Sequence, residues 1–250
     1  MSWKIDEITK EKINNPILIE GLPGIGNVGK IAADYMVEKT KAKKIFEITS
    51  YKFPHCVFVN EENLVELPMI EIYHKKIKNK SFLFLVGDIQ PMDEVTCYEF
   101  CDKILDIFQK LKGKEIITIG GIATERIPKK PKTYCTGTDQ KIIKRYKNKQ
   151  KIGNLNKIVG PIIGVSGLLI GLAKRRKIPA ISLLTETFGH PNYFSVKSAK
   201  EVLKILNEKF KLNLKITDLE DEINEIESSI KKKRKLSKPK RHHHDSNYIG

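Results

Sequence analysis

The chain has 250 residues, which is long enough to bury a full hydrophobic core without disulfides or a structural metal. Its 40% hydrophobic and 30% charged residues exclude a disordered chain. Since no apolar run reaches the ~20 residues of a membrane helix and the first residues do not resemble a signal peptide, we expect a soluble, cytoplasmic protein with no membrane partner. The net charge is +16, but aromatic–basic interleaving and known reading motifs are lacking, so we expect no specific nucleic-acid partner.

The first third of the chain predicts short strands around a glycine-rich turn. Residues 16–20 form a short apolar strand, and residues 21–29 form the turn. Residues 28–39 have the apolar spacing of a helix, and residues 45–48 predict the next strand. Residues 56–73 predict a β-hairpin.

The middle of the chain alternates strands and helices. Residues 81–87 include five consecutive large apolar residues, which is typical of a central parallel strand buried on both faces. A helix is predicted to begin after Asp93 and to end at Gly113, before a buried strand at residues 115–119. Residues 124–156 have little periodicity and predict a long excursion, partly helical in its second half.

The last third of the domain repeats the alternation. Residues 158–176 run from a glycine-spaced apolar segment into a helix, and residues 179–184 predict a strand. Ser195 is expected to cap a final helix. Strands that alternate with helices predict an α/β domain over residues 1–215, with a mixed, mainly parallel sheet flanked by helices.

The end of the chain predicts a separate unit. Residues 216–232 predict an amphipathic helix, and residues 233–250 a flexible basic tail, because like charges repel. The helix is equally compatible with a coiled coil and with packing against the body or a neighbouring subunit. We do not interpret the histidines of residues 242–244, native or added, as a metal site. The apolar stripe of the helix consists of Leu219, Ile223, Ile226 and Ile230.

One motif indicates a ligand-binding loop. Gly24, Gly26 and Gly29 have the G-x-G-x-x-G spacing between a strand and a helix, which lets backbone amides approach a pyrophosphate. Glu47 lies where a ribose-binding acid is expected. A magnesium-binding P-loop is disfavoured because Ile31 stands where a Ser or Thr is needed. The alternative is close strand–helix packing with no ligand.

Further signs of catalytic chemistry are weak. Asp88 and Glu186 follow predicted strands, where α/β sheets bind ligands, but both are equally suited to cap turns. The segment around Ser166 departs from the nucleophile elbow, because its last glycine is displaced. We therefore predict no catalytic residue, no cofactor and no metal. Free buried thiols are the expected state of Cys56, Cys97, Cys101 and Cys135.

Several segments in order resemble one family. The resemblance covers roughly residues 15–230 and is more specific than any single motif. The segments are Gly21-Leu22-Pro23-Gly24-Ile25-Gly26-Asn27-Val28-Gly29, Ala32-Ala33-Asp34-Tyr35, Val65-Glu66-Leu67-Pro68, Asp88-Ile89-Gln90-Pro91, Ile119-Gly120-Gly121, Gly164-Val165-Ser166-Gly167-Leu168-Leu169 and Leu183-Leu184-Thr185-Glu186-Thr187. The sequence resembles the archaeal relatives of the proteasome assembly chaperones.

The resemblance implies a function without catalysis. It implies a nucleoside-phosphorylase-like α/β sandwich that forms homo-oligomers and acts without ATP. It implies binding to the proteasome core particle, or its α subunits, through C-terminal tails that end in a hydrophobic residue, Tyr and any residue. A nucleotide- or dinucleotide-binding α/β enzyme that uses the loop from Gly24 to Gly29 is the alternative hypothesis.

The tail of this chain departs from the family pattern. The partner-binding residues that the resemblance implies are Tyr248, Ile249 and Gly250, but Asn247 precedes the tyrosine and the register is shifted by one residue. Ile249 still offers an apolar anchor, and a terminal carboxylate is present if Gly250 is the native end. A tail with no partner is the alternative.

Overall fold

The computed structural model describes residues 3–60, 62–147, 152–155, 160–190 and 193–216. Residues 1–214 form one compact unit, and residues 215–250 are assigned to a second. The predicted helix stripe and tail therefore lie outside the described residues. This applies to Leu219, Ile223, Ile226, Ile230, Tyr248, Ile249 and Gly250.

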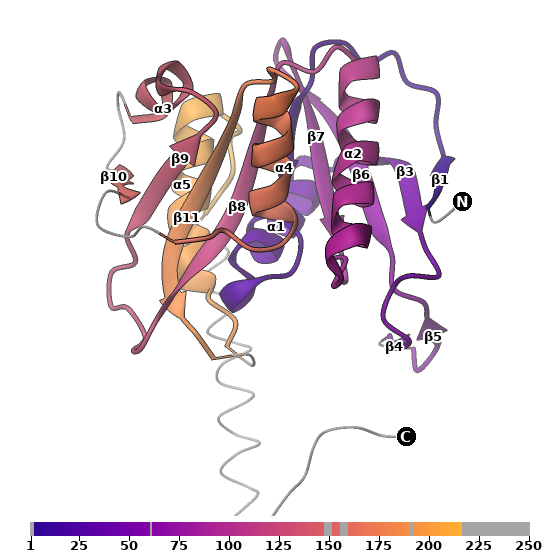
Figure 1. Ribbon diagram of the computed structural model, residues 1–250, viewed down its shortest axis with the longest axis horizontal. Coiled ribbons are helices and arrows are strands. Elements are labelled where there is room, and N and C mark those ends of the chain that lie inside the picture. The colour runs from indigo at the N-terminus through magenta and orange to yellow at the C-terminus, as the bar shows by residue number, and fades with distance from the viewer. Residues whose placement is uncertain (1–2, 61, 148–151, 156–159, 191–192, 217–250) are drawn as a thin grey trace, which may run out of the picture. The chain divides into compact units, whose positions relative to one another are not determined.

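Within the described residues, nine strands form one mixed sheet, as the sequence predicts (Figure 1). The strands are β1 (Lys4–Glu7), β2 (Ile17–Glu20), β3 (Lys43–Thr49), β6 (Ile70–Ile77), β7 (Lys80–Gly87), β8 (Glu115–Thr124), β9 (Thr133–Gly137), β10 (Ile152–Asn154) and β11 (Ala180–Phe188). Their order in the sheet is β1-β3-β6-β7-β2-β8-β11-β9-β10. The central strands β7, β2, β8 and β11 are parallel, whereas β6 is antiparallel to both of its neighbours.

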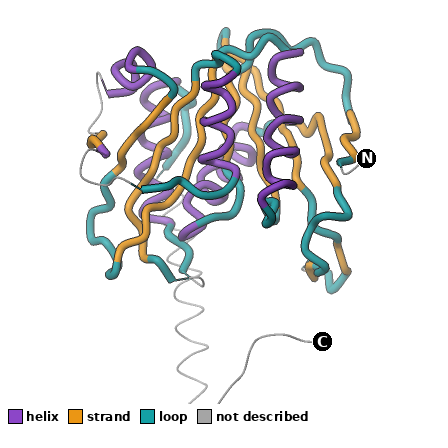
Figure 2. The backbone as a smooth tube through the Cα atoms, viewed as in Figure 1, coloured by secondary structure: helices purple, strands orange, loops and turns teal. Residues whose placement is uncertain are grey.

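Helices cover both faces of the sheet (Figures 1 and 2). They are α1 (Val28–Thr40), α2 (Glu94–Lys110), α3 (Gln140–Lys147), α4 (Val165–Arg175) and α5 (Val196–Phe210). Helices α2 and α4 contact one another on one face, and α1 and α5 contact one another on the other. Because both faces are covered, strands β2 and β7 are buried along nearly their whole length, as the apolar run in residues 81–87 predicts.

The segment predicted as a hairpin divides between two sheets. Strands β4 (Phe58–Val59) and β5 (Val65–Glu66) pair with one another in a small two-stranded sheet. The rest of the segment is β6, which joins the main sheet. The prediction is therefore confirmed only for β4 and β5, because the apolar residues of β6 are buried by pairing with β3 and β7.

Residues 124–156, predicted as an excursion, contribute regular elements. They include β9, α3 and β10, and β9 pairs with β11 and β10 inside the main sheet. The sequence predicts the helical part but neither strand, because the segment is rich in lysine and has few apolar residues. In α3, for example, only Ile142 and Tyr146 are buried. In the described part of the chain, no helix is long and apolar enough to cross a membrane.

The two predicted helix starts differ in their capping. Asp93 caps α2 as expected, since its side chain accepts a hydrogen bond from the backbone N–H of Thr96. Ser195 stands at the start of α5, but its side chain makes no capping hydrogen bond. Its Oγ lies 2.5 Å from the Oγ of Ser198, which donates to the backbone carbonyl of Glu186. Ser195 therefore occupies the predicted N-cap position, but the expected capping hydrogen bond is missing because its hydroxyl pairs with that of Ser198 in the first turn of α5.

Candidate functional site

The glycine motif forms a tight turn between β2 and α1. The turn contains a short 3-10 helix (Ile25–Asn27), in which Gly26 has φ of +64° and Asn27 has φ of +49°. Such left-handed backbone is available to Gly and Asn at low cost. The sequence therefore folds locally as predicted, with a strand, a glycine turn and a helix.

The three glycines of the motif differ in how much room each has for a side chain. A Cβ on Gly29 would lie 2.5 Å from the backbone oxygen of Ile119, and one on Gly26 would lie 2.3 Å from Oγ1 of Thr187. A Cβ on Gly24 would meet no atom within 4 Å. Gly26 and Gly29 are therefore required for packing, whereas Gly24 borders open space.

The expectation that Glu47 binds a ribose is wrong. It lies on β3, which is separated from β2 by β7 and β6 in the sheet. Its Oε1 pairs with Nζ of Lys44 at 2.5 Å. Two intervening strands keep this carboxylate away from the glycine turn, so the second half of the dinucleotide signature is missing.

A phosphate-binding lysine is also missing from the turn. Nζ of Lys30 donates to the backbone oxygen of Gly87 at 2.9 Å and lies 3.1 Å from Oδ2 of Asp34. These partners hold the ammonium group at the end of β7. The geometry agrees with the sequence, which disfavours a P-loop.

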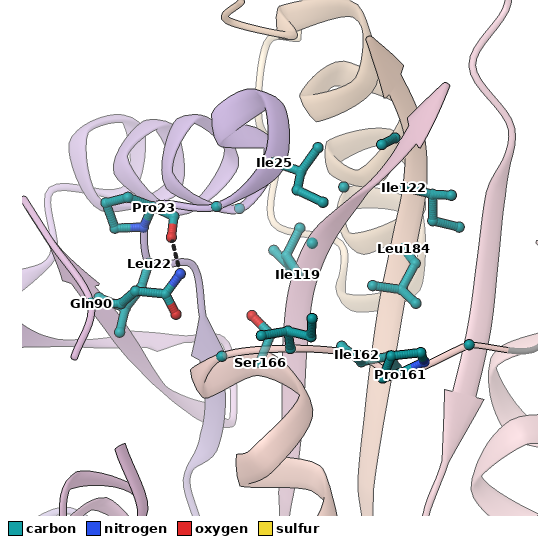
Figure 3. A pocket seen from close by; sticks show the side chains of 18 of the residues that line it. Leu22, Pro23, Ile25, Gln90, Ile119, Ile122, Pro161, Ile162, Ser166 and Leu184 are labelled. Carbon is teal, nitrogen blue, oxygen red and sulfur yellow. Dashed lines mark hydrogen bonds between the residues drawn. The ribbon is translucent and has the colours of Figure 1, made fainter. Parts of the chain in front are cut away.

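A pocket of about 770 Å³ opens beside the glycine turn (Figure 3). It lies at the carboxyl end of β2 and runs along β8 and β11, where α/β sheets commonly bind ligands. The described residues that line it carry no charged side chain. Its apolar side chains are Leu22, Pro23, Ile25, Ile119, Ile122, Ala123, Leu155, Pro161, Ile162, Ile163 and Leu184. Six glycines contribute their backbone to the lining: Gly24, Gly29, Gly120, Gly121, Gly160 and Gly164. The polar side chains that line it are Gln90, Thr136 and Ser166.

A buried carboxyl group lies beside this pocket. Glu20 ends β2 and is fully buried. Its Oε1 accepts the backbone N–H of Leu22 at 3.0 Å, and its Oε2 accepts the Ser166 hydroxyl at 2.8 Å. Burial raises the pKa of Glu20 to about 7 despite these two donors. Since Leu22 and Ser166 line the pocket, the carboxyl group is joined to its wall.

Gln90 ties three loops around the pocket. Its Nε2 donates to the backbone oxygen of Pro23 at 2.7 Å (Figure 3). Its Oε1 accepts the backbone N–H of Val165 at 3.1 Å. Gly164 has φ of +84° and leaves no room for a Cβ, which would lie 2.5 Å from Oε1 of Gln90. The loops after β2 and β7 and the start of α4 are therefore held together around the pocket.

Comparison with known proteins identifies the family of this chain. The model of the PAC2 family matches residues 18–234. The chain belongs to the PAC2 family. This agrees with the resemblance over residues 15–230 that the sequence motifs indicate.

Relatives of this PAC2-family chain include two solved structures from Pyrococcus furiosus. PbaB, described as an archaeal proteasome activator, is 32% identical, with a TM-score of 0.84 over 93% of this chain and 99% of that one. PbaA, described as an archaeal homolog of proteasome-assembly chaperone, is 24% identical, with a TM-score of 0.78 over 93% of this chain and 92% of that one, and shows the fold alone. An uncharacterized protein of Methanocaldococcus jannaschii is 28% identical over 226 residues, 90% of this chain and 86% of that protein.

The other acids singled out in this PAC2-family chain have structural partners. Asp88 accepts the backbone N–H of Met69 at 3.2 Å. Glu186 accepts the backbone N–H of Lys132 at 3.1 Å and the hydroxyl of Tyr134 at 2.7 Å. Both carboxylates therefore hydrogen-bond neighbouring loops or strands, and neither residue lines the pocket.

The cysteines are free thiols, and one differs from the expectation. Cys97, Cys101 and Cys135 are buried, but Cys56 is exposed because it precedes the small β4–β5 sheet at the surface. The hydrogen bond with Cys97, followed by burial, raises the pKa of the Cys101 thiol. Among the described residues, no group of His, Cys, Asp and Glu is placed to hold a metal ion.

The sequence interpretation missed Glu20 and Gln90 as parts of the site. An acidic residue that ends a buried apolar strand, directly before a glycine turn, is a usable signal for a buried carboxyl group. Gln90 has no such signal. Its contacts join residues that lie 67 and 75 positions away in the sequence, which only the fold brings together.

Proposed function

We propose that this chain is an ATP-independent proteasome assembly chaperone or core-particle-binding protein that forms a homo-oligomer and engages α subunits through its C-terminal tails. The observation that carries the proposal is the likeness to PbaB, an archaeal proteasome activator, over 93% of this chain and 99% of that one. Identity of 32% over this length supports a related function and not the fold alone.

The glycine turn supports a function without ATP. Lys30 is bound to the backbone oxygen of Gly87 and to Asp34, and Ile31 replaces the hydroxyl that would bind magnesium. The alternative, a nucleotide- or dinucleotide-binding enzyme, loses support because Glu47 lies on a distant strand.

Exposed apolar side chains support self-association. They gather on and beside the small β4–β5 sheet, and a lone two-stranded sheet has little stability of its own in water. Apolar clusters of this kind commonly mark protein interfaces. The exposed side chains are Val57, Phe58, Val59, Leu64, Val65 and Leu67.

The tail is tested by removing it. We expect deletion of residues 247–250 to abolish co-migration with a proteasome core particle, because several tails on one oligomer act together at a ring. Tyr248→Ala should weaken co-migration, whereas Asp245→Ala should leave it unchanged. The measurement is native gel electrophoresis with purified core particle, with native mass spectrometry of each variant alone to give the oligomer mass.

Three outcomes would contradict parts of this proposal. Unchanged co-migration after the deletion would remove the tail from the mechanism. A full-length chain that never co-migrates would overturn core-particle binding. A monomeric mass for the full-length chain would overturn the homo-oligomer.

A further inference from the structure

The pocket beside the glycine turn is lined by residues of the α/β domain, between Leu22 and Leu184. Its volume of about 770 Å³ falls in the range of small-molecule sites, which is roughly 300–1,000 Å³. Gln90 fixes the loops that form one side of it, through Pro23 and Val165. The side of the cavity that these hydrogen bonds hold in place does not need to reorganise to admit a ligand.

The walls of the pocket select against charge. The described lining residues include no Lys, Arg, Asp or Glu, and their side chains are mostly aliphatic. A phosphate or carboxylate placed there would lose its hydration without gaining a counter-ion, which is costly. Lys30 supplies no compensation, because Gly87 and Asp34 hold its ammonium group.

One polar group in the wall is oriented to accept a hydrogen bond. Ser166 lines the pocket and donates its hydroxyl proton to the fully buried Glu20, 2.8 Å away. Since that proton is committed, the lone pairs of Ser166 Oγ remain to accept an N–H or O–H from a ligand. Hydrogen bonding to a carboxyl group polarises the hydroxyl and strengthens this acceptor.

We propose that this pocket binds an uncharged, mostly apolar small molecule that donates one N–H or O–H group to Ser166. The aliphatic wall from β8, β11 and residues 160–164 contacts the apolar body of the molecule. The Ser166–Glu20 pair orients it. The residues of this site differ from those proposed for the tail, so the pocket provides a second means by which the protein binds another molecule.

Gly24 offers a way to fill the pocket without disturbing the fold. It has φ of −162°, which is extended backbone that any residue adopts, and a Cβ there meets no atom within 4 Å. Gly160 also lines the pocket and has equally open space at its Cβ position. Gly171 provides the matched control, because it is exposed on α4, has open space and does not line the pocket.

The experiment is a fluorescence titration of the full chain with N-phenyl-1-naphthylamine, an uncharged molecule in which one N–H donor joins a naphthyl and a phenyl group. We expect saturable binding of one molecule per chain. Gly24→Leu and Gly160→Leu should each weaken binding at least tenfold, and Gly171→Leu should leave it unchanged. Ser166→Ala should weaken it about two- to tenfold, which is the loss of one hydrogen bond.

The result that overturns the proposal is equally specific. If the full-length chain shows no saturable binding, or if both leucine variants bind as tightly as Gly171→Leu, the pocket is not the site. If AMP or NAD⁺ displaces the naphthylamine at lower concentrations than uncharged competitors do, the ligand class is wrong. Core-particle co-migration of Gly24→Leu should be unchanged, so failure here is distinguishable from failure of the proposed function.

Discussion

Glu20, the last residue of β2, is completely buried. Its position follows from the parallel sheet, because β7 and β8 flank β2 and helices cover both faces. The backbone N–H of Leu22 and the Ser166 hydroxyl satisfy its oxygens. These two donors reduce the cost of burying the charge but do not cancel it, since the pKa is still raised to about 7.

This raised pKa predicts that the protein loses stability as pH rises. The pKa of Glu20 is about 7 when folded and 4.5 in the reference state, so the folded chain binds the proton more tightly. The stabilisation is full below pH 4.5 and is lost as pH rises towards 7. The loss from this group is at most about 3 kcal/mol.

The measurement compares urea unfolding of wild type and Glu20→Gln at pH 5 and pH 8. The glutamine keeps an oxygen for Leu22 N–H and stays neutral, so its stability should decline less over this interval than that of wild type. An equal decline in both proteins would show that Glu20 does not cause the pH dependence.

The β2–turn–α1 unit shows how glycines position elements. Gly29 brings the start of α1 against β8, since a Cβ would lie 2.5 Å from the Ile119 oxygen. Gly21 is equally restricted, with a Cβ position 2.3 Å from the Gly29 oxygen. The glycines of the turn therefore allow α1 to pack closely against β2 and β8, and the turn also borders the pocket.

We expect Gly29→Ala to lower the free energy of unfolding by about 1–3 kcal/mol, because the methyl group forces α1 away from β8. Gly171→Ala should instead raise the free energy of unfolding by about 0.5–1 kcal/mol. Gly171 is a solvent-exposed position in the middle of α4, with open space at its Cβ position. Urea unfolding of both variants measures the difference. If Gly29→Ala is as stable as the wild type or more stable, the assignment of Gly29 to packing is wrong.

The described α/β domain carries a cluster of positive charge at one end of its sheet. Residues 39–43, 75–80, 110–114, 174–177 and 209–211 lie at the amino ends of the parallel strands or at the helix ends beside them, and they contain no acid. The helix macrodipole favours a cation in the last turn of a helix, but it does not account for the lysines of the β6–β7 turn. The cations in these segments are Lys39, Lys41, Lys43, Lys75, Lys76, Lys78, Lys80, Lys110, Lys112, Lys114, Lys174, Arg175, Arg176, Lys177, Lys209 and Lys211.

Mutual repulsion within this basic end predicts a gain in stability when one charge is reversed. Lys76 is exposed near the end of β6, and three other lysines lie within four residues of it around the β6–β7 turn, so Lys76→Glu should raise the free energy of unfolding by roughly 0.2–1 kcal/mol. Lys103→Glu is the control, because it places a third acid beside Glu99 and Asp106 on α2 and should lower stability by about 0.2–0.5 kcal/mol.

Salt dependence completes the test of the basic end. Added salt screens repulsion between exposed charges, so the gain from Lys76→Glu should shrink between 0.05 and 0.5 M KCl, where the screening length falls from about 14 to about 4 Å. Urea unfolding at both salt concentrations gives the two values. A gain that does not change with salt would show that electrostatic repulsion is not its source.

Local patterns in the sequence determined most elements and the family. The apolar run of residues 81–87, the cap at Asp93 and the glycine turn are local signals, and each folds as predicted because backbone preference and burial act within a few residues. The tertiary structure alone decided that Glu47 lies two strands from the turn and that residues 133–137 enter the sheet. It alone brought Ser166 to Glu20, 146 residues away, because strand order and loop contacts depend on packing across the whole domain.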